Sequence, residues 1–388
     1  MERNPDLEAK LIADPSNTDA YLVYADFLQS KSDPRGELIT LQHAGKTKEA
    51  EAFLEAHADE LYGPLKNYRK TFDGSAADAF SWRLGFIRSA RLSLDSNSVD
   101  EVEVEDGVEI SLETCLAELL KHPSGMLLEE LVIPINMLDD GAYFEPLVKV
   151  IAEHGAPTLK SLRIGEFSCA GGPGGTGDYE YEISWTTLGD ASGLWKAVPR
   201  LERLVLQVGL GSTSASGTTD NLGQIDLPNL RHLEVITGGM SQSCVTSFVE
   251  AKLPELVYMD LWLGSSSYGF AGSVDDVVPI LDGARLPKLQ HLGLMNTELT
   301  DDICDRLGTA KILPRLREVS LKYGTMSDAG ARALASTKTA FKHLTLLDVS
   351  ENCLGSEGVG EVEGLCSNVM TDQQKAGDED DRYVSLSE

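Results

Sequence analysis

One spacing of apolar residues recurs through most of the chain and limits what it can fold into. Residues 344–354 read LTLLDVSENCL, which places apolar side chains and one asparagine in the order L-x-x-L-x-V-x-x-N-x-L. From residue 127 onward the frame returns about every 30 residues. Its middle apolar position is held by eight residues: Leu131, Leu162, Leu204, Leu233, Met259, Leu292, Val319 and Leu347.

The last part of each frame is expected to form a short strand, because alternate side chains of a strand point to opposite faces. The leucines then enter the core, and the residues between them stand on a shared parallel sheet. Helical stretches lie between the strands and begin at capping residues: Ser111 for residues 110–123, Thr300 for 300–310 and Ser327 for 327–336. A strand and a helix in every unit predict a curved stack whose concave side is lined by strands.

These motifs, together with TDDI and SDAGA, resemble the ribonuclease-inhibitor-like subfamily of leucine-rich repeats over residues 127–365. The resemblance implies an α/β solenoid with a curved parallel sheet inside and helices outside. Asn352 holds the asparagine position, where the side chain bridges backbone groups at the turn, and Asn136 is a second candidate. Inserts at 165–185 and 209–224 directly follow strands and are expected to project from one rim.

The first part of the chain has a helical pattern with two start signals in which Asn or Asp precedes proline. These signals are Asn4-Pro5 and Asp33-Pro34. The stretch from residue 4 to 44 is similar to the bacterial repeat-companion domain, a small all-α module found ahead of leucine-rich repeats. The matching residues are Tyr24-Ala25-Asp26-Phe27-Leu28, Asp33-Pro34-Arg35-Gly36-Glu37 and Gln42. This resemblance implies no particular chemistry.

We therefore predict four parts. They are a helical repeat-companion-like domain at 1–80, an N-terminal cap with an acidic hairpin and a helix at 81–126, about eight leucine-rich repeats at 127–365, and an acidic tail at 366–388. The tail has a polar composition typical of loose chain. Its last residues, YVSLSE, could instead add a small strand.

The net charge of the chain limits the kinds of molecule that it is expected to bind. There are 33 Lys+Arg and 62 Asp+Glu residues, giving a formal net charge of -29. Such a field repels nucleic acid and anionic lipid and attracts basic protein surfaces, although it could also serve solubility alone. The sequence has no signal-peptide pattern, no apolar run of about 18 residues and no C-x-x-C pair. These features predict a monomeric cytoplasmic protein with reduced thiols and no membrane contact.

Motifs of catalysis are sparse. Gly172, Gly174 and Gly177 formally match G-x-G-x-x-G, but an extended stretch follows and Asp178 stands where a phosphate loop needs lysine. A flexible insert is the favoured interpretation. The histidines lack metal-ligand spacing. We therefore predict a non-enzymatic protein without a cofactor or a metal.

The frame also predicts which side chains line the concave face. Ile236, Trp262 and Met295 should form an apolar ridge near Tyr258, because adjacent strands lie ~4.8 Å apart. Exposed apolar patches of this kind mark interaction surfaces. The alternative is that a rim insert or the tail folds over the ridge. The predicted partner-binding residues are Arg203, His232, Ile236, Tyr258, Asp260, Trp262, His291 and Met295.

Three functions remain open at this point. The first is a scaffold that binds a protein or peptide, with a basic one favoured by the charge, on the concave face. The second is an inhibitor or immunity-type regulator that captures a basic enzyme or toxin through acidic rims. The third is a regulator similar to GTPase-activating proteins, for which no set of residues can be nominated.

Overall fold

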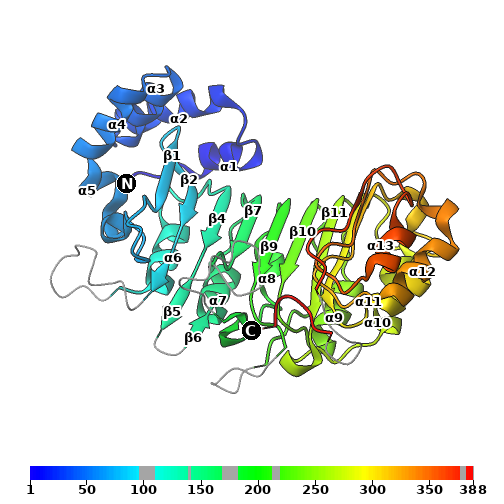
Figure 1. Ribbon diagram of the computed structural model, residues 1–388. Coiled ribbons are helices and arrows are strands. Elements are labelled where there is room, and N and C mark those ends of the chain that lie inside the picture. Colours follow the sequence, from blue (N-terminus) through cyan, green and yellow to red (C-terminus); the bar gives the residue numbers. More distant parts are fainter. Residues whose placement is uncertain (96–109, 139–140, 168–181, 212–218, 376–381, 388) are drawn as a thin grey trace. The chain divides into compact units, whose positions relative to one another are not determined.

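The structure is a computed structural model that describes residues 1–95, 110–138, 141–167, 182–211, 219–375 and 382–387 (Figure 1). The chain divides into two compact units. The first comprises Met1–Asp139, Pro146–Arg163 and Lys196–Leu201, and the second comprises Asp140–Glu145, Ile164–Trp195 and Glu202–Glu388. The predicted acidic hairpin falls largely on 96–109, and the glycine motif falls on 168–181, so both lie outside the described residues. The four predicted domain boundaries remain predictions.

Helices and strands alternate along most of the described chain. The α-helices are α1 (Pro5–Ala13), α2 (Thr18–Ser30), α3 (Arg35–His43), α4 (Thr47–Ala56), α5 (Ala58–Tyr62), α6 (Leu112–Lys121), α7 (Glu145–His154), α8 (Leu194–Ala197), α9 (Gln242–Val249), α10 (Val274–Asp282), α11 (Thr300–Leu307), α12 (Asp328–Ser336) and α13 (Ser356–Val362). The strands are β1 (Phe80–Arg83), β2 (Phe86–Arg91), β3 (Leu94–Asp95), β4 (Glu130–Ile133), β5 (Asn136–Leu138), β6 (Gly141–Tyr143), β7 (Ser161–Ile164), β8 (Thr186–Thr187), β9 (Arg203–Gln207), β10 (His232–Ile236), β11 (Tyr258–Gly264), β12 (His291–Thr297), β13 (Glu318–Ser320), β14 (Leu346–Asp348) and β15 (Val369–Met370).

The first unit joins the N-terminal helices to the first strands. Buried Leu11, Tyr24 and Leu28 from α1 and α2 pack in one cluster with Phe86 of β2. Strand β1 pairs antiparallel with β2, and β2 pairs parallel with β4. Burial of these apolar side chains against the sheet accounts for the helical arrangement, since isolated helices of this length are marginal in water.

Both predicted start signals act at the beginning of a helix. Asn4 caps α1 as expected, because its side chain accepts a hydrogen bond from the Leu7 N–H at 3.2 Å. Asp33 acts in a similar way, because its carboxylate accepts a hydrogen bond from the Arg35 N–H at 3.0 Å, although Pro34 is the residue directly before α3. Asp33 also forms a buried ion pair with the Arg35 guanidinium at 2.8 Å.

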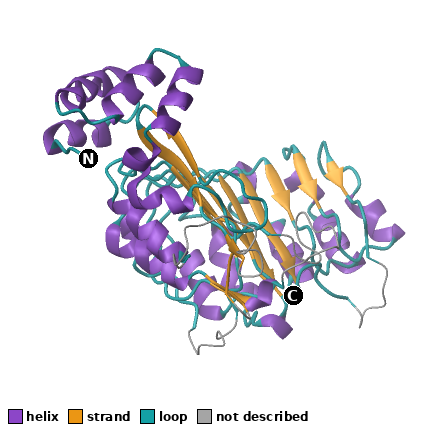
Figure 2. Ribbon diagram, turned by 90° about the vertical axis from the view of Figure 1, so that its left-hand side faces the viewer, coloured by secondary structure: helices purple, strands orange, loops and turns teal. Residues whose placement is uncertain are grey.

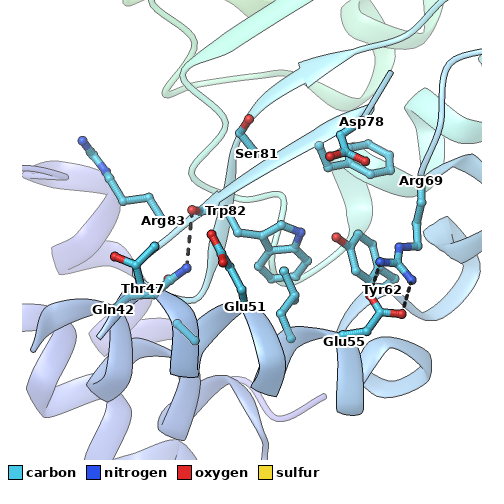
Figure 3. A pocket seen from close by; sticks show the side chains of 13 residues that line it. Gln42, Thr47, Glu51, Glu55, Tyr62, Arg69, Asp78, Ser81, Trp82 and Arg83 are labelled. Carbon is cyan, nitrogen blue, oxygen red and sulfur yellow. Dashed lines mark hydrogen bonds and ion pairs between the residues drawn. The ribbon is translucent and has the colours of Figure 1, made fainter. Parts of the chain in front are cut away.

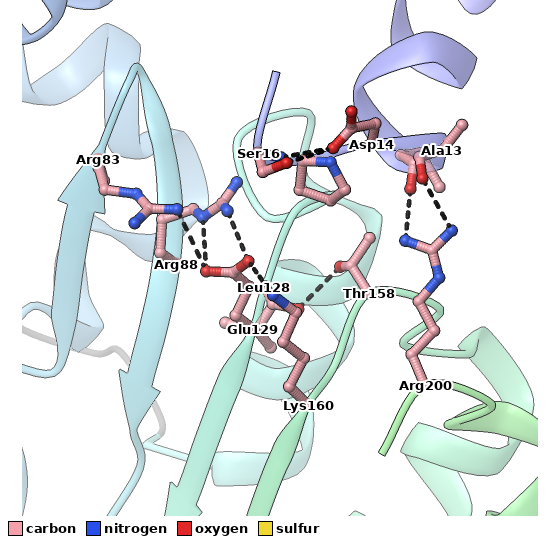
Figure 4. Close-up of polar contacts among 12 residues, drawn as sticks. Ala13, Asp14, Ser16, Arg83, Arg88, Leu128, Glu129, Thr158, Lys160 and Arg200 are labelled. Atoms are coloured by element: carbon pink, nitrogen blue, oxygen red, sulfur yellow. Dashed lines mark hydrogen bonds and ion pairs between the residues drawn. The ribbon is translucent and has the colours of Figure 1, made fainter. Parts of the chain in front are cut away.

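A polar cluster within the first unit centres on Glu129, just before β4 (Figure 4). Arg88 of β2 forms an ion pair with this carboxylate at 2.7 Å, and Lys160 approaches it at 3.1 Å. Arg88 also donates a hydrogen bond to the Tyr21 hydroxyl at 2.9 Å. Arg200 donates to the Ile12 carbonyl at the end of α1 at 2.6 Å. These contacts tie helices α1 and α2 to the first strands.

In the second unit, strands β9 to β15 follow one another in sequence order and are all parallel (Figure 2). Parallel neighbours need a crossover connection, and helices α9 to α13 supply it between β10 and β15. The leucine anchors of these strands are buried. A large, mostly parallel sheet with connecting helices confirms the α/β repeat fold.

The turn after β14 shows why the frame carries an asparagine. Asn352 is fully buried, and its amide donates to the carbonyls of Leu321 and Val349 at 2.8 and 3.0 Å. Its carbonyl oxygen accepts from the Met326 N–H at 2.9 Å. One side chain therefore satisfies the backbone of two successive repeats, as the frame predicts.

The predicted helix caps are partly confirmed. Ser111 and Ser327 each accept a hydrogen bond from the first turn of α6 and α12. Thr300 is not a cap, because α11 already begins at this residue. Its hydroxyl instead donates to the Thr297 carbonyl at 2.7 Å and accepts from the Thr325 N–H at 3.2 Å. No helix among the described residues is long and apolar enough to cross a membrane.

Candidate functional site

The predicted columns of side chains exist on strands β9 to β13. We call the side of these strands opposite the leucine anchors the front face. The registers pair Arg203 with His232, His232 with Tyr258, Tyr258 with His291 and His291 with Glu318. The column just before the middle anchor is therefore confirmed neighbour by neighbour. The apolar spacing alone sets this register, because a slip by one residue would turn the leucines out of the core.

Three rings of this column form a stack. The Tyr258 ring lies 4.3 Å from the His232 ring and 4.0 Å from the His291 ring, measured between centroids. The interplanar angles are 6° and 7°, so the rings are almost parallel. Parallel strands repeat at a spacing close to the thickness of stacked rings, which explains why three aromatic side chains in one column meet face to face.

Carboxylates surround the stack. The Tyr258 hydroxyl donates to Asp260 at 2.5 Å, and the other Asp260 oxygen lies 2.8 Å from His291 Nε2. His291 Nδ1 lies 3.0 Å from a Glu318 oxygen. Space for Asp260 comes from Gly293, since a Cβ there would lie 2.0 Å from the carboxylate. The result is a continuous chain of hydrogen bonds across three strands.

This network of hydrogen bonds shifts the pKa values of the residues in it. Burial disfavours the charged His291 ring, but the hydrogen bonds and charges of Asp260 and Glu318 together raise the pKa of His291 above its ordinary value. When the ring is protonated, both ring nitrogens donate, one to each carboxylate. Burial, followed by the charge of Asp260, raises the pKa of Tyr258. A tyrosine held neutral in this way is a poor base or nucleophile, so the network is better suited to holding side chains in place.

The apolar ridge has the predicted members but not the predicted exposure. Trp262 and Met295 are register neighbours, and both belong to one cluster with Ile236. Trp262 is only 2% exposed, because Ile183 and Leu386 pack on the ridge from outside the sheet. The expectation that the ridge meets solvent is therefore wrong. The alternative, in which an insert and the tail cover it, describes the structure.

Of the predicted set, the Arg203 side chain stays accessible and is 43% exposed. Glu318, which lies in the same column but was not in that set, has a side chain that is 44% exposed. His232 and Tyr258 are half-buried, whereas Asp260 and Met295 are buried. The accessible part of the front face is thus polar and aromatic, and it is not the apolar ridge.

Sequence reasoning missed the residues that hold the cover in place. Asn296, at the end of β12, contacts the backbone of Leu386 through both atoms of its amide. Residues 382–387 of the tail form no strand, bend at Ser385 and place Leu386 on the ridge. The two aliphatic residues Val384 and Leu386 in the otherwise polar end of YVSLSE were the available signal.

A separate cavity of about 520 Å³ lies in the first unit, between α4 and β1 (Figure 3). The Trp82 ring stands inside it, edge-on to Tyr62 at 5.2 Å. Arg69 lies over the Tyr62 ring and pairs with Glu55 at 2.5 Å. Because its best-placed cation is already matched by an anion, the cavity shows no preference for a charged ligand.

Across the part of the chain that the structure describes, no group of three His, Cys, Asp or Glu side chains is placed to hold a metal ion. The carboxylates and imidazoles of the front face instead bind one another. The chemistry that this face offers is hydrogen bonding, charge and aromatic stacking, which is the chemistry of macromolecular recognition.

Similarity to known proteins was found for one repeat and for the fold. A model of the leucine-rich repeat matches residues 342–361. A Bacteroides fragilis protein solved by structural genomics shares 22% identity, with 75% of this chain and 80% of that chain aligned and a TM-score of 0.60. An internalin from Listeria monocytogenes aligns over 75% of this chain and 82% of its own at 14% identity, with a TM-score of 0.28. No curated protein matches the sequence.

The class of fold follows from these observations together. The parallel strands and the buried apolar anchors define an α/β repeat fold, and residues 342–361 match the leucine-rich repeat model. The likeness to the Bacteroides protein concerns the fold alone.

Proposed function

We propose that the chain is a non-enzymatic scaffold that binds a protein or peptide on the front face of β9 to β13. The observation that carries the proposal is the partly buried aromatic stack of His232, Tyr258 and His291, bordered by the exposed side chains of Arg203 and Glu318. Tyr and Arg dominate the energetics of protein interfaces. The network around Tyr258 holds these side chains in place before binding, which reduces the entropy lost on association.

The charge of the face favours a basic partner segment. Glu234, Asp260 and Glu318 stand on the front face, and the whole chain carries a net charge of -29. The second candidate function, which this negative charge favours, is an inhibitor or immunity-type regulator that captures a basic protein. Binding that weakens steeply with salt supports this second candidate, whereas salt-insensitive binding supports the scaffold alone.

The setting of the protein is part of the same proposal. The N-terminal helices are a repeat-companion-like domain, as the motif at 33–37 suggests, and the protein is bacterial, cytoplasmic and monomeric. Repulsion by the acidic surface keeps nucleic acid away. The face is proposed to act without a cofactor.

Tyr258→Ala is expected to weaken partner capture by about 30-fold, since loss of an aromatic interface anchor costs about 2 kcal/mol or more. Tyr258→Phe keeps the stack and should retain most of the binding. The measurement is quantitative mass spectrometry of proteins retained from a native extract by each immobilised variant. Arg332→Ala, which changes an exposed side chain of α12, is the matched control. Recovery of the same proteins in equal amounts by all four forms would contradict the proposed function.

A further inference from the structure

The C-terminal segment 382–387 lies on the ridge of the front face as a peptide ligand would. Leu386 is 0% exposed and packs in the cluster of Ile236, Trp262 and Met295. Val384 is also buried. The chain bends at Ser385, between these two buried aliphatic side chains.

Side chains and carbonyls of the second unit form hydrogen bonds with the backbone of this segment. Asn296 accepts from the Leu386 N–H at 2.9 Å and donates to the Leu386 carbonyl at 2.6 Å. The Ser385 N–H donates to the Tyr323 carbonyl at 3.0 Å. Asn296 is fully buried and has φ of 47°, a conformation that asparagine tolerates better than most residues. Contacts of this kind accept any extended chain, because every residue offers the same N–H and C=O.

The N-terminal end of the segment is fixed by charge. Arg382 pairs with Asp301 at 3.0 Å and donates to the Thr325 carbonyl at the same distance. Lys375 donates to the carbonyls of Tyr383 and Gly324 at 2.6 and 2.9 Å. Burial lowers the pKa of Lys375 to about 8. A peptide that fits here in place of the segment is therefore expected to carry a basic residue four positions before the residue that replaces Leu386.

Glycines let the backbone of the segment pass close to the second unit's strands. A cavity of about 210 Å³ borders Ser387 and is walled mainly by glycines. A Cβ on Gly238 would lie 2.2 Å from the Ser387 carbonyl, so the chain passes here at a distance that only glycine allows.

We propose that the ridge, Asn296 and Asp301 form a peptide-binding groove, and that the chain's own C-terminal segment is its tethered occupant. The partner is a segment of another protein with the pattern Arg-x-aliphatic-x-Leu, which displaces residues 382–387. This inference deepens the proposed function, on which it rests, by naming the kind of ligand that the front face takes. A tether holds its ligand at an effective concentration of about 1 mM, so an untethered peptide competes poorly until the tail is weakened.

The test uses a fluorescein-labelled peptide RYVSLS, which reproduces residues 382–387, and fluorescence anisotropy with the full chain. The parent protein should bind the peptide weakly. Leu386→Asp removes the apolar anchor of the tail and should bind the peptide at least about 10-fold more tightly. The same peptide with aspartate in place of its leucine should not bind. Equal affinity of parent and Leu386→Asp for RYVSLS would overturn the proposal.

Two further variants keep the result interpretable. Leu386→Asp combined with Asn296→Gly loses the backbone clamp but not the φ that this position requires, and it should return peptide binding to the parent's weak level. Undiminished binding by the double variant would contradict the groove. Iodide quenching of Trp262 fluorescence, with Trp262→Phe as the blank, should rise in Leu386→Asp, and unchanged quenching would show that the tail does not cover the ridge. Because the assay needs no natural partner, its failure leaves the Tyr258 surface intact, whereas failure of partner capture leaves the groove intact.

Discussion

Replacing Leu292 with aspartate is expected to abolish the cooperative unfolding transition of the second unit. Leu292 is a buried anchor of β12 and lies in register with Met259 and Val319 on the neighbouring strands. An unpaired carboxylate there costs at least about 5 kcal/mol, which approaches the whole stability of many domains. Successive repeats stabilise one another, so the damage should extend to the adjacent strands. Thermal melts followed by circular dichroism measure the effect.

Leu292→Met is the matched control, because it keeps the volume and apolar character of the side chain. Its cost should stay under about 1.5 kcal/mol. A Leu292→Asp protein that melts within a few degrees of the parent would show that this side chain does not stand in the core of the stack.

The second large effect is expected at Arg35, where Arg35→Met should destabilise the first unit by about 3–5 kcal/mol. The Arg35 and Asp33 side chains are 0% and 2% exposed, and their ion pair measures 2.8 Å. Burial tends to raise the pKa of Asp33, but the hydrogen bond and charge of Arg35 lower it overall. Without Arg35 the carboxylate is left uncompensated in the interior. Urea unfolding followed by Tyr and Trp fluorescence measures the loss.

Asp33→Asn in the Arg35→Met background should restore part of the lost stability, because it removes the stranded charge. Arg332→Met, in an exposed pair with Glu357 at 3.7 Å, should change stability by less than about 1 kcal/mol. Equally small losses of stability in Arg35→Met and Arg332→Met would show that the buried ion pair stabilises the first unit no more than an exposed pair does.

The repeat frame was enough to predict the register of the front face. Leu233, Met259 and Leu292 must all point inward, and this fixes His232, Tyr258 and His291 as neighbours. Asn352 was likewise predictable, because its place in the frame has one physical role, the satisfaction of buried turn groups. The local spacing of residues in the repeat frame is therefore what predicts the fold.

The segments that cover the ridge could not be predicted from the sequence in the same way. Asn296 and Leu386 lie 90 positions apart, and neither residue stands in a repeat position that would indicate the other. The buried ion pair of Asp33 was missed for a related reason, since an aspartate before proline can serve a helix start without any ion pair. Contacts between distant segments depend on packing that no local pattern encodes.

Amide hydrogen exchange of Ser385 and Leu386 in the full-length protein tests the central claim most directly. Both amides donate hydrogen bonds at the front face, to the Tyr323 carbonyl and to Asn296. Exchange should be at least about 100-fold slower than in the free peptide, and saturating RYVSLS should remove that protection by displacing the segment. Exchange of both amides at the rate of an unstructured chain, with or without peptide, would contradict the account.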